Sequence, residues 1–373
     1  MQLYKHERAF LIYFLPLFAV KLINITADNI ILQTVAIISF STFIAYFYNK
    51  KYPRKLMRLY TILGLYSAML VVTCGKQGVF FSVISVILMR GIDFKRVVYK
   101  WCLYIGVLFL LLSCYIERNT GEITIRYING EWTEIFKRSN ILFISYIAVM
   151  FLLLLQLKNF LRWKFVLPLI ACSYLMSVYT GSRTGIVVVS FFFILAFCLQ
   201  LEFVKNCNIV KVLCLLSPVI CLGTVYIATI NYGNNSLVDV LDMLTQGRIY
   251  QNRFFLDEYG ISLFGQHIVE NFGQDATGDF ACLDSAYMDM LICEGFIFTV
   301  FWIFVTMKVI QYMWEHNRMV EVAMLVSYAV YGITETFLIN CFLNISIFFY
   351  GEYLYAKYDK AKSFYIKEGL REE

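Results

Sequence analysis

NYGNNSLVDVLDMLTQGRIYQNRFFLDEYGISLFGQHIVENFGQDATGDFACLD, residues 231–284, is the longest stretch of this sequence that cannot lie in the hydrocarbon core of a membrane. It carries two arginines, one histidine and several carboxylates. Long apolar blocks come directly before and after it. These blocks decide the fold, and we expect the polar stretch between them to hold much of the chemistry.

The composition of the chain excludes a water-soluble protein. Of its 373 residues 60% are hydrophobic and only 16% are charged, and the mean hydropathy is +0.68. A soluble domain carries roughly a quarter charged residues. The apolar residues recur in blocks of roughly 17 to 25, the length of an α-helix that crosses a bilayer. The sequence therefore predicts an all-α, polytopic membrane protein that forms a single integral membrane domain over residues 1–373.

The apolar blocks predict twelve transmembrane helices. The first block has no small-residue cleavage site and is followed at once by a second block, so we interpret it as a retained helix and not as a signal peptide. The twelve predicted spans are residues 9–26, 29–48, 59–74, 78–92, 98–116, 140–157, 165–181, 185–201, 212–230, 285–307, 320–336 and 337–355.

The positive charges predict the orientation of these spans. The segments between alternate spans, together with both chain ends, hold 23 of the 32 Lys and Arg residues. Cytoplasmic loops carry the excess of Lys and Arg. We therefore expect the protein to lie in the inner membrane of the cell, with both termini in the cytoplasm. The same rule places residues 117–139, 181–185 and 231–284 outside. We attribute the basic excess to topology and anionic lipid, and not to nucleic-acid binding.

No motif for a metal or a cofactor is present. Nearly all of the eleven cysteines lie within or at the ends of spans and none forms a CxxC pair, so we interpret them as core residues. The three histidines lack zinc-ligand spacing, and Asp275 and Asp279 do not match a calcium loop. There is no phosphate-binding loop and no dinucleotide fingerprint. We expect neither a metal nor a cofactor.

A short polar turn interrupts the apolar sequence at YTGSRTGIVVV, residues 179–189. Its two glycines allow a sharp turn, and Arg183 between them lies at the membrane boundary on the outer side, where arginine is scarce. A snorkelling side chain at a helix end is one interpretation. The other is a fixed guanidinium whose fork binds phosphate oxygens.

The long loop predicts two short helices. Ser236 and Asp239 form a capping-box pattern, and the leucines and valines that follow repeat at helical spacing, which indicates an amphipathic helix lying on the bilayer. Gly247 ends it, and a second helix is expected from Arg248 to Tyr259 with Gly260 as its stop. The remainder of the loop to Gly278 is predicted to be irregular.

Several carboxylates follow the loop. Asp284 opens the next span, where it is expected either to cap the helix or to act on a substrate, and the two roles can coexist. Asp289, Glu294 and Glu335 lie deeper in apolar sequence. Carboxylates at such depth are costly unless they are paired or face a hydrated cavity. They predict a cleft that opens to the outer side.

These residues resemble a known family. Many spans, an S-R-T-G turn opening a helix, a long outer loop with arginines, and F-G followed by D-x-x-Y-x-x-x-x-x-x-x-G at the loop exit are similar to the O-antigen ligase and polymerase superfamily. The closing Y-G-I-T-E-T-F-x-I-N at 331–340 resembles the Wzy-type polymerases of capsule and O-antigen repeat units. The resemblance covers residues 116 to 373.

The resemblance implies a metal-independent membrane glycosyltransferase with a glycosyltransferase-C-like fold. Such an enzyme moves a glycan from polyprenyl diphosphate onto the non-reducing end of a new lipid-linked unit at the outer face of the membrane. Its substrate is a polyprenyl-diphosphate-linked oligosaccharide, and a flippase and a chain-length regulator of the same pathway are expected partners.

The expected roles follow from this chemistry. Guanidinium groups neutralise the departing diphosphate, and a carboxylate or imidazole takes the proton of the acceptor hydroxyl. A tyrosine can stack on a sugar face. The arginines of the loop have an alternative role in pairing with Asp257, Glu258 or lipid headgroups. The expected catalytic residues are Asp284 as first and His267 as second choice of base, with Arg183 and Arg248 on the diphosphate; the expected substrate-binding residues are Arg253, Arg126, Arg138, Glu335 and Tyr250.

Two other functions remain open. A ligase of the same superfamily would use the same donor with a different acceptor, and the sequence barely separates the two. A flippase or transporter of lipid-linked oligosaccharide would carry its charges along the spans at mid-depth, often in two related halves. No internal repeat is visible, and the charge is concentrated in one outer loop, which favours an enzyme.

Overall fold

The computed structural model describes residues 4–23, 30–48, 52–120, 123–128, 131–136, 139–157, 163–272 and 280–359. Helices dominate this part of the chain. They are α1 (Lys5–Leu22), α2 (Ile30–Tyr48), α3 (Arg54–Cys74), α4 (Gly78–Leu88), the π-helix η1 (Phe94–Val98), α5 (Tyr99–Thr120), α6 (Ser139–Gln156), α7 (Trp163–Thr180), α8 (Arg183–Cys198), α9 (Glu202–Lys205), α10 (Asn208–Asn231), α11 (Ser236–Leu244), α12 (Arg248–Tyr259), α13 (Ala286–Asp289), the π-helix η2 (Met290–Glu294), α14 (Phe296–Glu315), α15 (Met319–Tyr331) and α16 (Ile347–Asp359).

Five of these helices are long and apolar enough to cross a membrane, namely α2, α3, α5, α10 and α14. Five more are apolar but shorter, among them α8 and α15. Large apolar side chains also face outward, for example Ile30 at 76% and Val72 at 85% exposure, as lipid-facing side chains do. The predicted class, a helical membrane protein, is supported, and the number of twelve spans stays a prediction.

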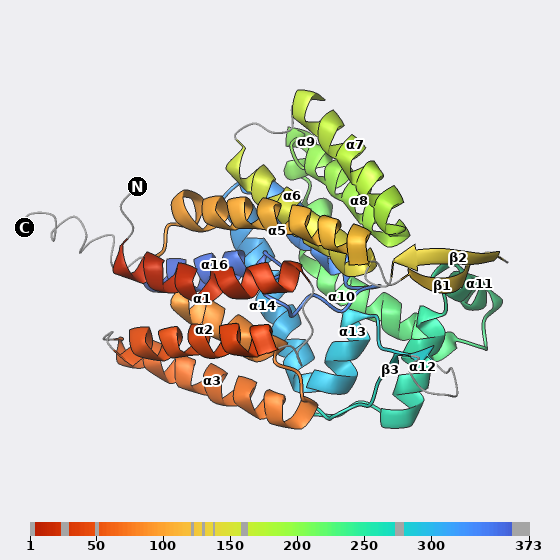
Figure 1. Ribbon diagram of the computed structural model, residues 1–373, viewed down its shortest axis with the longest axis horizontal. Helices are drawn as coiled ribbons and strands as arrows, with labels where there is room; N and C mark the ends of the chain where they lie inside the picture. The colour runs from red at the N-terminus through yellow and green to blue at the C-terminus, as the bar shows by residue number, and fades with distance from the viewer. Residues whose placement is uncertain are drawn as a thin grey trace, which may run out of the picture.

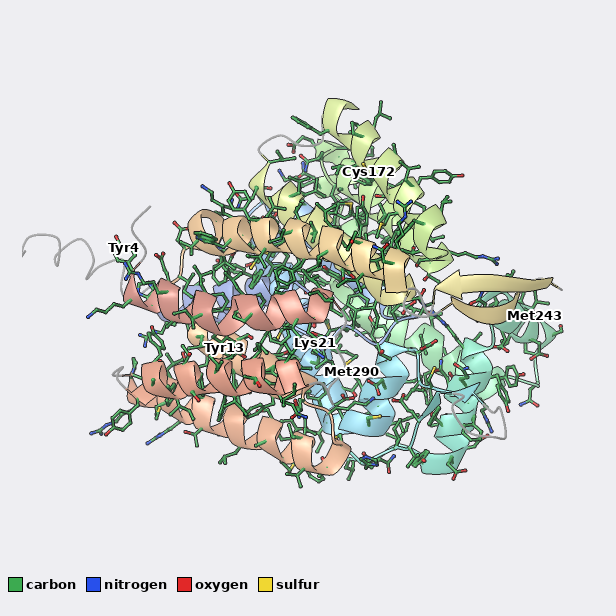
Figure 2. The ribbon with its side chains drawn as sticks, in the orientation of Figure 1. Tyr4, Tyr13, Lys21, Cys172, Met243 and Met290 are labelled. Carbon is green, nitrogen blue, oxygen red and sulfur yellow. The ribbon has the colours of Figure 1, made fainter. Side chains whose placement is uncertain are left out.

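The two ends of the molecule differ. In Figure 1 helices α1, α2, α3 and α5 run along the long axis, and the start of α1 lies at the end opposite to α11. In this view the hairpin of β1 (Ile123–Ile128) and β2 (Glu131–Phe136) lies toward the same end as α11. Figure 2 shows Met243 of α11 at this same end, far from Tyr4. The predicted outer segments thus gather at one end.

Two short hairpins modify the all-α prediction. Strands β1 and β2 pair antiparallel, with Arg126 opposite Thr133, and β3 (Asn271–Phe272) pairs with β4 (Phe280–Ala281). Both hairpins lie in segments predicted to be outside the membrane. In such segments water satisfies the exposed strand edges, which lipid cannot do.

Helix α15 lies at the centre of the bundle. All but two of its thirteen residues are buried, and it packs against α8, α10 and α14. Close approach elsewhere depends on a glycine: a Cβ at Gly185 of α8 would lie 2.1 Å from the ring of Phe143 on α6. Small residues at helix crossings of this kind are typical of packing in membranes.

The predicted span at 285–307 is wrong in its continuity. The chain forms α13, then the π-helix η2, and turns at Gly295 with φ +92° before α14 begins. The loop supplies the reason. The backbone N–H of Gln266 donates to Cys293 O at 2.8 Å, and the N–H of Phe296 donates to Ser262 O at 2.8 Å. These bonds replace part of the helical ladder, which an apolar run in sequence does not reveal.

The predicted span at 337–355 is also wrong at its start. Residues 332–346 form a series of turns, and α16 begins only at Ile347. Asparagine side chains compete with the helix here. Asn344 Nδ2 donates to Leu338 O at 2.7 Å, and Asn344 Oδ1 accepts from the backbone N–H of Ser346 at 3.1 Å. Such local side-chain bonds favour turns over helix.

The loop helices were predicted well except at their caps. Helix α12 spans Arg248–Tyr259, between Gly247 and Gly260, as predicted. Helix α11 begins at Ser236, but its N-cap is Asn235, whose side chain accepts from Leu237 N at 3.0 Å. Asp239 instead accepts from the N–H of Gly233 at 3.0 Å, so the predicted capping box is wrong.

An ion cluster joins three helices at the start of α15. Arg318 Nε donates to Glu321 at 2.8 Å and its Nη1 bonds Glu352 of α16, while the hydroxyl of Tyr99 donates to Glu352 at 2.9 Å. The side chains of Arg318, Glu321 and Glu352 are 21%, 11% and 17% exposed. The cluster ties α5, α15 and α16 together.

Arg318→Ala is expected to lower the free energy of unfolding by about 3 kcal/mol, because removing the cation leaves two mostly buried carboxylates facing each other. Thermal unfolding in detergent measures the effect. Lys205→Ala is the matched control, since the pair of Lys205 with Glu202, 77% exposed, contributes less than about 1 kcal/mol. We call this ion cluster the Arg318 clamp. Equal shifts of the unfolding temperature in the two variants would contradict its stabilising role.

Candidate active site

Arg248 is the centre of a charged cluster at the end of the molecule that carries the long loop. Its Nε lies 3.2 Å from Asp284 Oδ2, and its Nη2 donates to Glu335 Oε1 at 3.0 Å. Its Nη1 bonds the carbonyl of Thr334. The side chain of Arg248 is 12% exposed and that of Glu335 is 8% exposed, whereas Asp284 is 34% exposed. Asp284 is thus the accessible edge of the cluster.

The start of α12 places Arg248. Gly247 precedes it with φ +81°, a backbone conformation that glycine adopts without strain. Asp242 of α11 then caps α12, because its Oδ1 accepts from the backbone N–H of Ile249 at 2.8 Å and of Tyr250 at 3.0 Å. A carboxylate at this position satisfies free N–H groups of the first turn.

Two backbone bonds bring Asp284 and Glu335 together. The N–H of Ala286 donates to Gly332 O at 3.0 Å, and the N–H of Glu335 donates to Tyr331 O at 3.1 Å. Gly332 is tightly packed, since a Cβ there would lie 2.2 Å from Leu338. The N-cap of α13 is Ser285, and Asp284 does not cap the helix, contrary to one of its two predicted roles.

The N-terminus of α8 forms the next part of the site. Thr184 Oγ1 donates to Glu335 Oε1 at 3.5 Å, so the S-R-T-G turn reaches the cluster. Its neighbour Arg183 is exposed, and no hydrogen bond or ion pair joins it to another residue in the described ranges. Within the described part of the chain, Arg183 is therefore an exposed cation next to Thr184 in sequence.

Buried polar atoms around the cluster lack partners. Within the described residues, Ser285 Oγ and Asn252 Oδ1 have no hydrogen bond, although each side chain is at most 3% exposed. Buried polar groups are nearly always paired, so such a concentration indicates room for water or for polar groups of a ligand.

The two carboxylates that contact Arg248, those of Glu335 and Asp284, differ in their electrostatic surroundings. Glu335 lies in the turn after α15, and burial raises its pKa from 4.5 to about 7, while Arg248 opposes the shift and the charge of Asp284 adds to it. Burial disfavours the charge on Arg248, but Glu335 and Asp284 outweigh it and raise the pKa of Arg248. Arg248 stays charged, whereas Glu335 exchanges its proton near neutral pH.

The raised pKa of Glu335 predicts that the stability of the protein depends on pH. Its folded pKa of about 7 lies above the ordinary value of 4.5, so its contribution is full below pH 4.5 and is lost as the pH rises through 7. The free energy of unfolding, relative to Glu335→Gln, is expected to fall by about 2.5 kcal/mol between pH 5 and pH 8. Thermal midpoints of both proteins in one buffer series measure it. Parallel curves for the two proteins would refute the assignment.

A second charged cluster lies next to the first. Lys76, in the tight turn between α3 and α4, forms an ion pair with Asp289 of α13. Glu294 of η2 is 3% exposed, and its Oε2 has no partner among the described residues. Glu270 of the loop accepts from the N–H of Leu283 at 3.0 Å and thus adjoins Asp284.

Sequence reasoning missed part of this arrangement. Lys76, Glu270 and Asp242 were not singled out. One signal could have found Lys76, because it is the single basic residue of TCGKQG, a turn predicted to lie on the outer side, where Lys and Arg are scarce. Asp242 and Glu270 act through backbone bonds to residues distant in sequence, for which the sequence contains no pattern.

The other predicted site residues lie apart from Arg248. His267 is exposed and lies beside Gly75, where a Cβ would be 3.2 Å from its Cδ2, and no bond joins it to Asp284 in the described ranges. Arg253 pairs with Asp257 at 2.7 Å, the alternative role considered for it. Tyr250 is 52% exposed and packs on Tyr232.

Two predicted arginines come from the segment before α6. The backbone of Arg126 lies in β1, at the same end of the molecule as α11. Arg138 lies outside the described residues. The glycine-rich part of the loop at 273–279, predicted to be irregular, also lies outside them.

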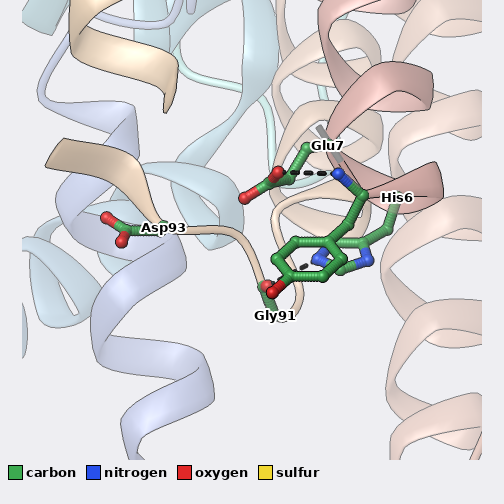
Figure 3. A pocket seen from close by; sticks show the side chains of 5 residues that line it. His6, Glu7, Gly91 and Asp93 are labelled. Carbon is green, nitrogen blue, oxygen red and sulfur yellow. Dashed lines mark hydrogen bonds between the residues drawn. The ribbon is translucent and has the colours of Figure 1, made fainter. Parts of the chain in front are cut away.

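A separate cavity of about 340 Å³ lies at the opposite end of the molecule. Figure 3 shows His6 and Glu7 of α1 facing Gly91 and Asp93 across it, with the His6 ring 2.8 Å from the carbonyl of Gly91. Tyr4 also lines it. This cavity shares no residue with the Arg248 cluster.

The described residues contain no group of three or more His, Cys, Asp and Glu side chains that could hold a metal ion. All eleven cysteines are free thiols. No family model, curated protein or solved structure matches the chain. The function must therefore be argued from the site itself.

Proposed function

We propose that this protein is a membrane glycosyltransferase that polymerises lipid-linked oligosaccharide repeat units into a surface polysaccharide. It would transfer the growing glycan from polyprenyl diphosphate to the non-reducing end of a new lipid-linked unit. One observation carries the proposal: Arg248 is held between an accessible and a buried carboxylate, beside the open Arg183, at the end of the bundle that gathers the predicted outer segments.

The proposed topology has twelve spans, cytoplasmic termini and a site at the outer face of the cytoplasmic membrane. The five long spans and the shorter apolar helices support it. The separation of the α1 start from α11 and α12 along the long axis agrees with it. The charge distribution between alternate spans gives the direction.

The donor diphosphate is assigned to the N-terminus of α8. Free N–H groups of a helix start attract phosphate oxygens, and Arg183 at its first position adds a guanidinium fork. The hydroxyl of Ser182, directly before Arg183, is a further donor at this turn. A diphosphate needs neutralisation of charge more than a proton when it leaves, and these groups supply that.

Asp284 is assigned as the base that takes the proton of the acceptor hydroxyl. In the transfer step the acceptor oxygen forms a bond to the anomeric carbon, the bond from that carbon to the phosphate oxygen breaks, and the diphosphate leaves with the electron pair. The acceptor hydroxyl gives its proton to the Asp284 carboxylate, which later releases it to water. Arg248 orients Asp284 through a 3.2 Å contact, and Glu335 holds Arg248 from behind.

Gene deletion tests the proposal in cells that assemble a polymeric surface glycan with this protein. The expected result is a surface carrying single repeat units, with polymer restored by the wild-type gene. Accumulation of lipid-linked units inside the cell would point to a flippase. Polymer that stays on the polyprenyl carrier would point to a ligase. Normal polymer in the deletion strain would end the proposal.

A further inference from the structure

The second cluster has an accessible rim and a buried base. Lys76 is 32% exposed and its partner Asp289 is 6% exposed. Glu270 and Asp284 are also partly exposed. His267 of the long loop lies close to Gly75, the residue before Lys76. Beneath them Glu294 is 3% exposed and its Oε2 has no partner in the described part of the chain. Polar groups thus face outward around Lys76.

The charges in this cluster are coupled. Burial opposes the charge of Lys76, but the carboxylates of Asp289, Glu294 and Glu270 outweigh burial and raise the pKa of Lys76. Burial raises the pKa of Glu270, and Lys76 counteracts the shift. Lys76 therefore remains an ammonium donor, and the carboxylates around it are acceptors. Asp289 and Glu270 lie near this ammonium and Asp284 lies near Glu270, so a further anion would meet carboxyl groups on this side.

Asp284 belongs to the first cluster and adjoins the second. On one side Arg248 Nε contacts it at 3.2 Å. On the other side Glu270 binds the N–H of Leu283, the residue directly before Asp284. A transferase that joins two glycans needs its base between the donor and the acceptor, so the groups beyond Asp284 lie where an acceptor sugar would bind.

We propose that Lys76 and Glu270 form the acceptor subsite and bind hydroxyl groups of a neutral sugar at the non-reducing end of the incoming unit. This inference rests on the proposed function for the identity of the acceptor. The carboxylate of Glu270 accepts from sugar hydroxyls and the ammonium of Lys76 donates to them. Asp289 holds Lys76 through its ion pair. A uronic acid is disfavoured, because it would add a further negative charge.

Binding is tested with the full chain in lipid nanodiscs and a benzyl glycoside of the repeat unit, which lacks diphosphate and can serve only as acceptor. Saturation-transfer NMR measures its dissociation constant. Glu270→Gln and Lys76→Gln are each expected to weaken binding about 10-fold, since each removes a charged hydrogen-bond partner. Glu258→Gln, the same change at an exposed position of α12, is the matched control and is expected to bind as wild type.

The outcomes separate this inference from the proposed function. Unchanged binding in both variants, or no binding by wild type, overturns the subsite. Binding that depends on Glu270, with no transfer to the glycoside by wild type, leaves a sugar subsite and removes the polymerase. A second pair of probes tests charge: benzyl glucoside is expected to bind at least about 5-fold more tightly than benzyl glucuronide. Equal or reversed affinities would contradict a subsite for neutral sugar.

Discussion

Arg248→Ala is expected to abolish polymer formation, with a loss of rate of roughly 100-fold or more, because it removes the guanidinium that orients Asp284 and offsets charge at the site. The substitution also leaves Glu335, 8% exposed, without its cation. Such an uncompensated buried charge costs about 3 to 5 kcal/mol of stability. The length of the surface glycan on a gel measures the activity, and the amount of protein in the membrane measures the stability.

A second variant separates the two effects. Arg248→Met combined with Glu335→Gln removes the buried charge together with its partner, so the protein level is expected to recover while polymer stays absent. Arg58→Ala, an exposed arginine on α3, is the control. Polymer of normal length from the double variant would show that Arg248 serves the fold alone.

Asp284→Asn is expected to lower the transfer rate by roughly 1,000-fold at an unchanged protein level. The amide keeps the shape of the side chain and its contact with Arg248, but it cannot accept the proton of the acceptor hydroxyl. Initial rates of chain extension in membranes, with lipid-linked repeat units added, measure the change. Only a general base, and not a structural side chain, predicts so large a loss from an isosteric substitution.

Asp257→Asn provides the matched control for this substitution. Asp257 is an exposed carboxylate of the same loop, and its pair with Arg253 lies within one helix. Its loss is expected to change the rate less than twofold. If Asp284→Asn retained more than about a tenth of the wild-type rate, Asp284 would not be the base, and His267→Ala would become the next substitution to measure.

The sequence predicted helices where local rules decide them. Gly247 and Gly260 bound α12 as expected, since glycine ends a helix through its own backbone freedom. Most apolar blocks became helices within a few residues of their predicted bounds, for example α6 at Ser139–Gln156. A span requires only a run of apolar residues of sufficient length, and such a run is visible in the sequence.

The sequence could not predict breaks that depend on tertiary contacts. The run from Asp284 to Val305 is mostly apolar and predicts one continuous helix, yet the loop bonds to Cys293 and opens the helix at Gly295. The cap of α12 comes from Asp242, six residues before Arg248 and in another helix. The arginines of the site were singled out, but which carboxylate each contacts depends on the packing of helices far apart in the chain.

Helix α15 is short for its position, and this has a consequence for how a lipid-linked substrate would reach the site. Its thirteen residues rise about 20 Å, against roughly 30 Å of hydrocarbon. The Arg318 clamp lies at one end and the turn with Glu335 at the other. If the clamp lies at the cytoplasmic boundary, Glu335 and Arg248 lie about 10 Å below the outer lipid headgroups. A polyprenyl chain could then stay in the bilayer while its diphosphate enters the site from the side, without being lifted into water.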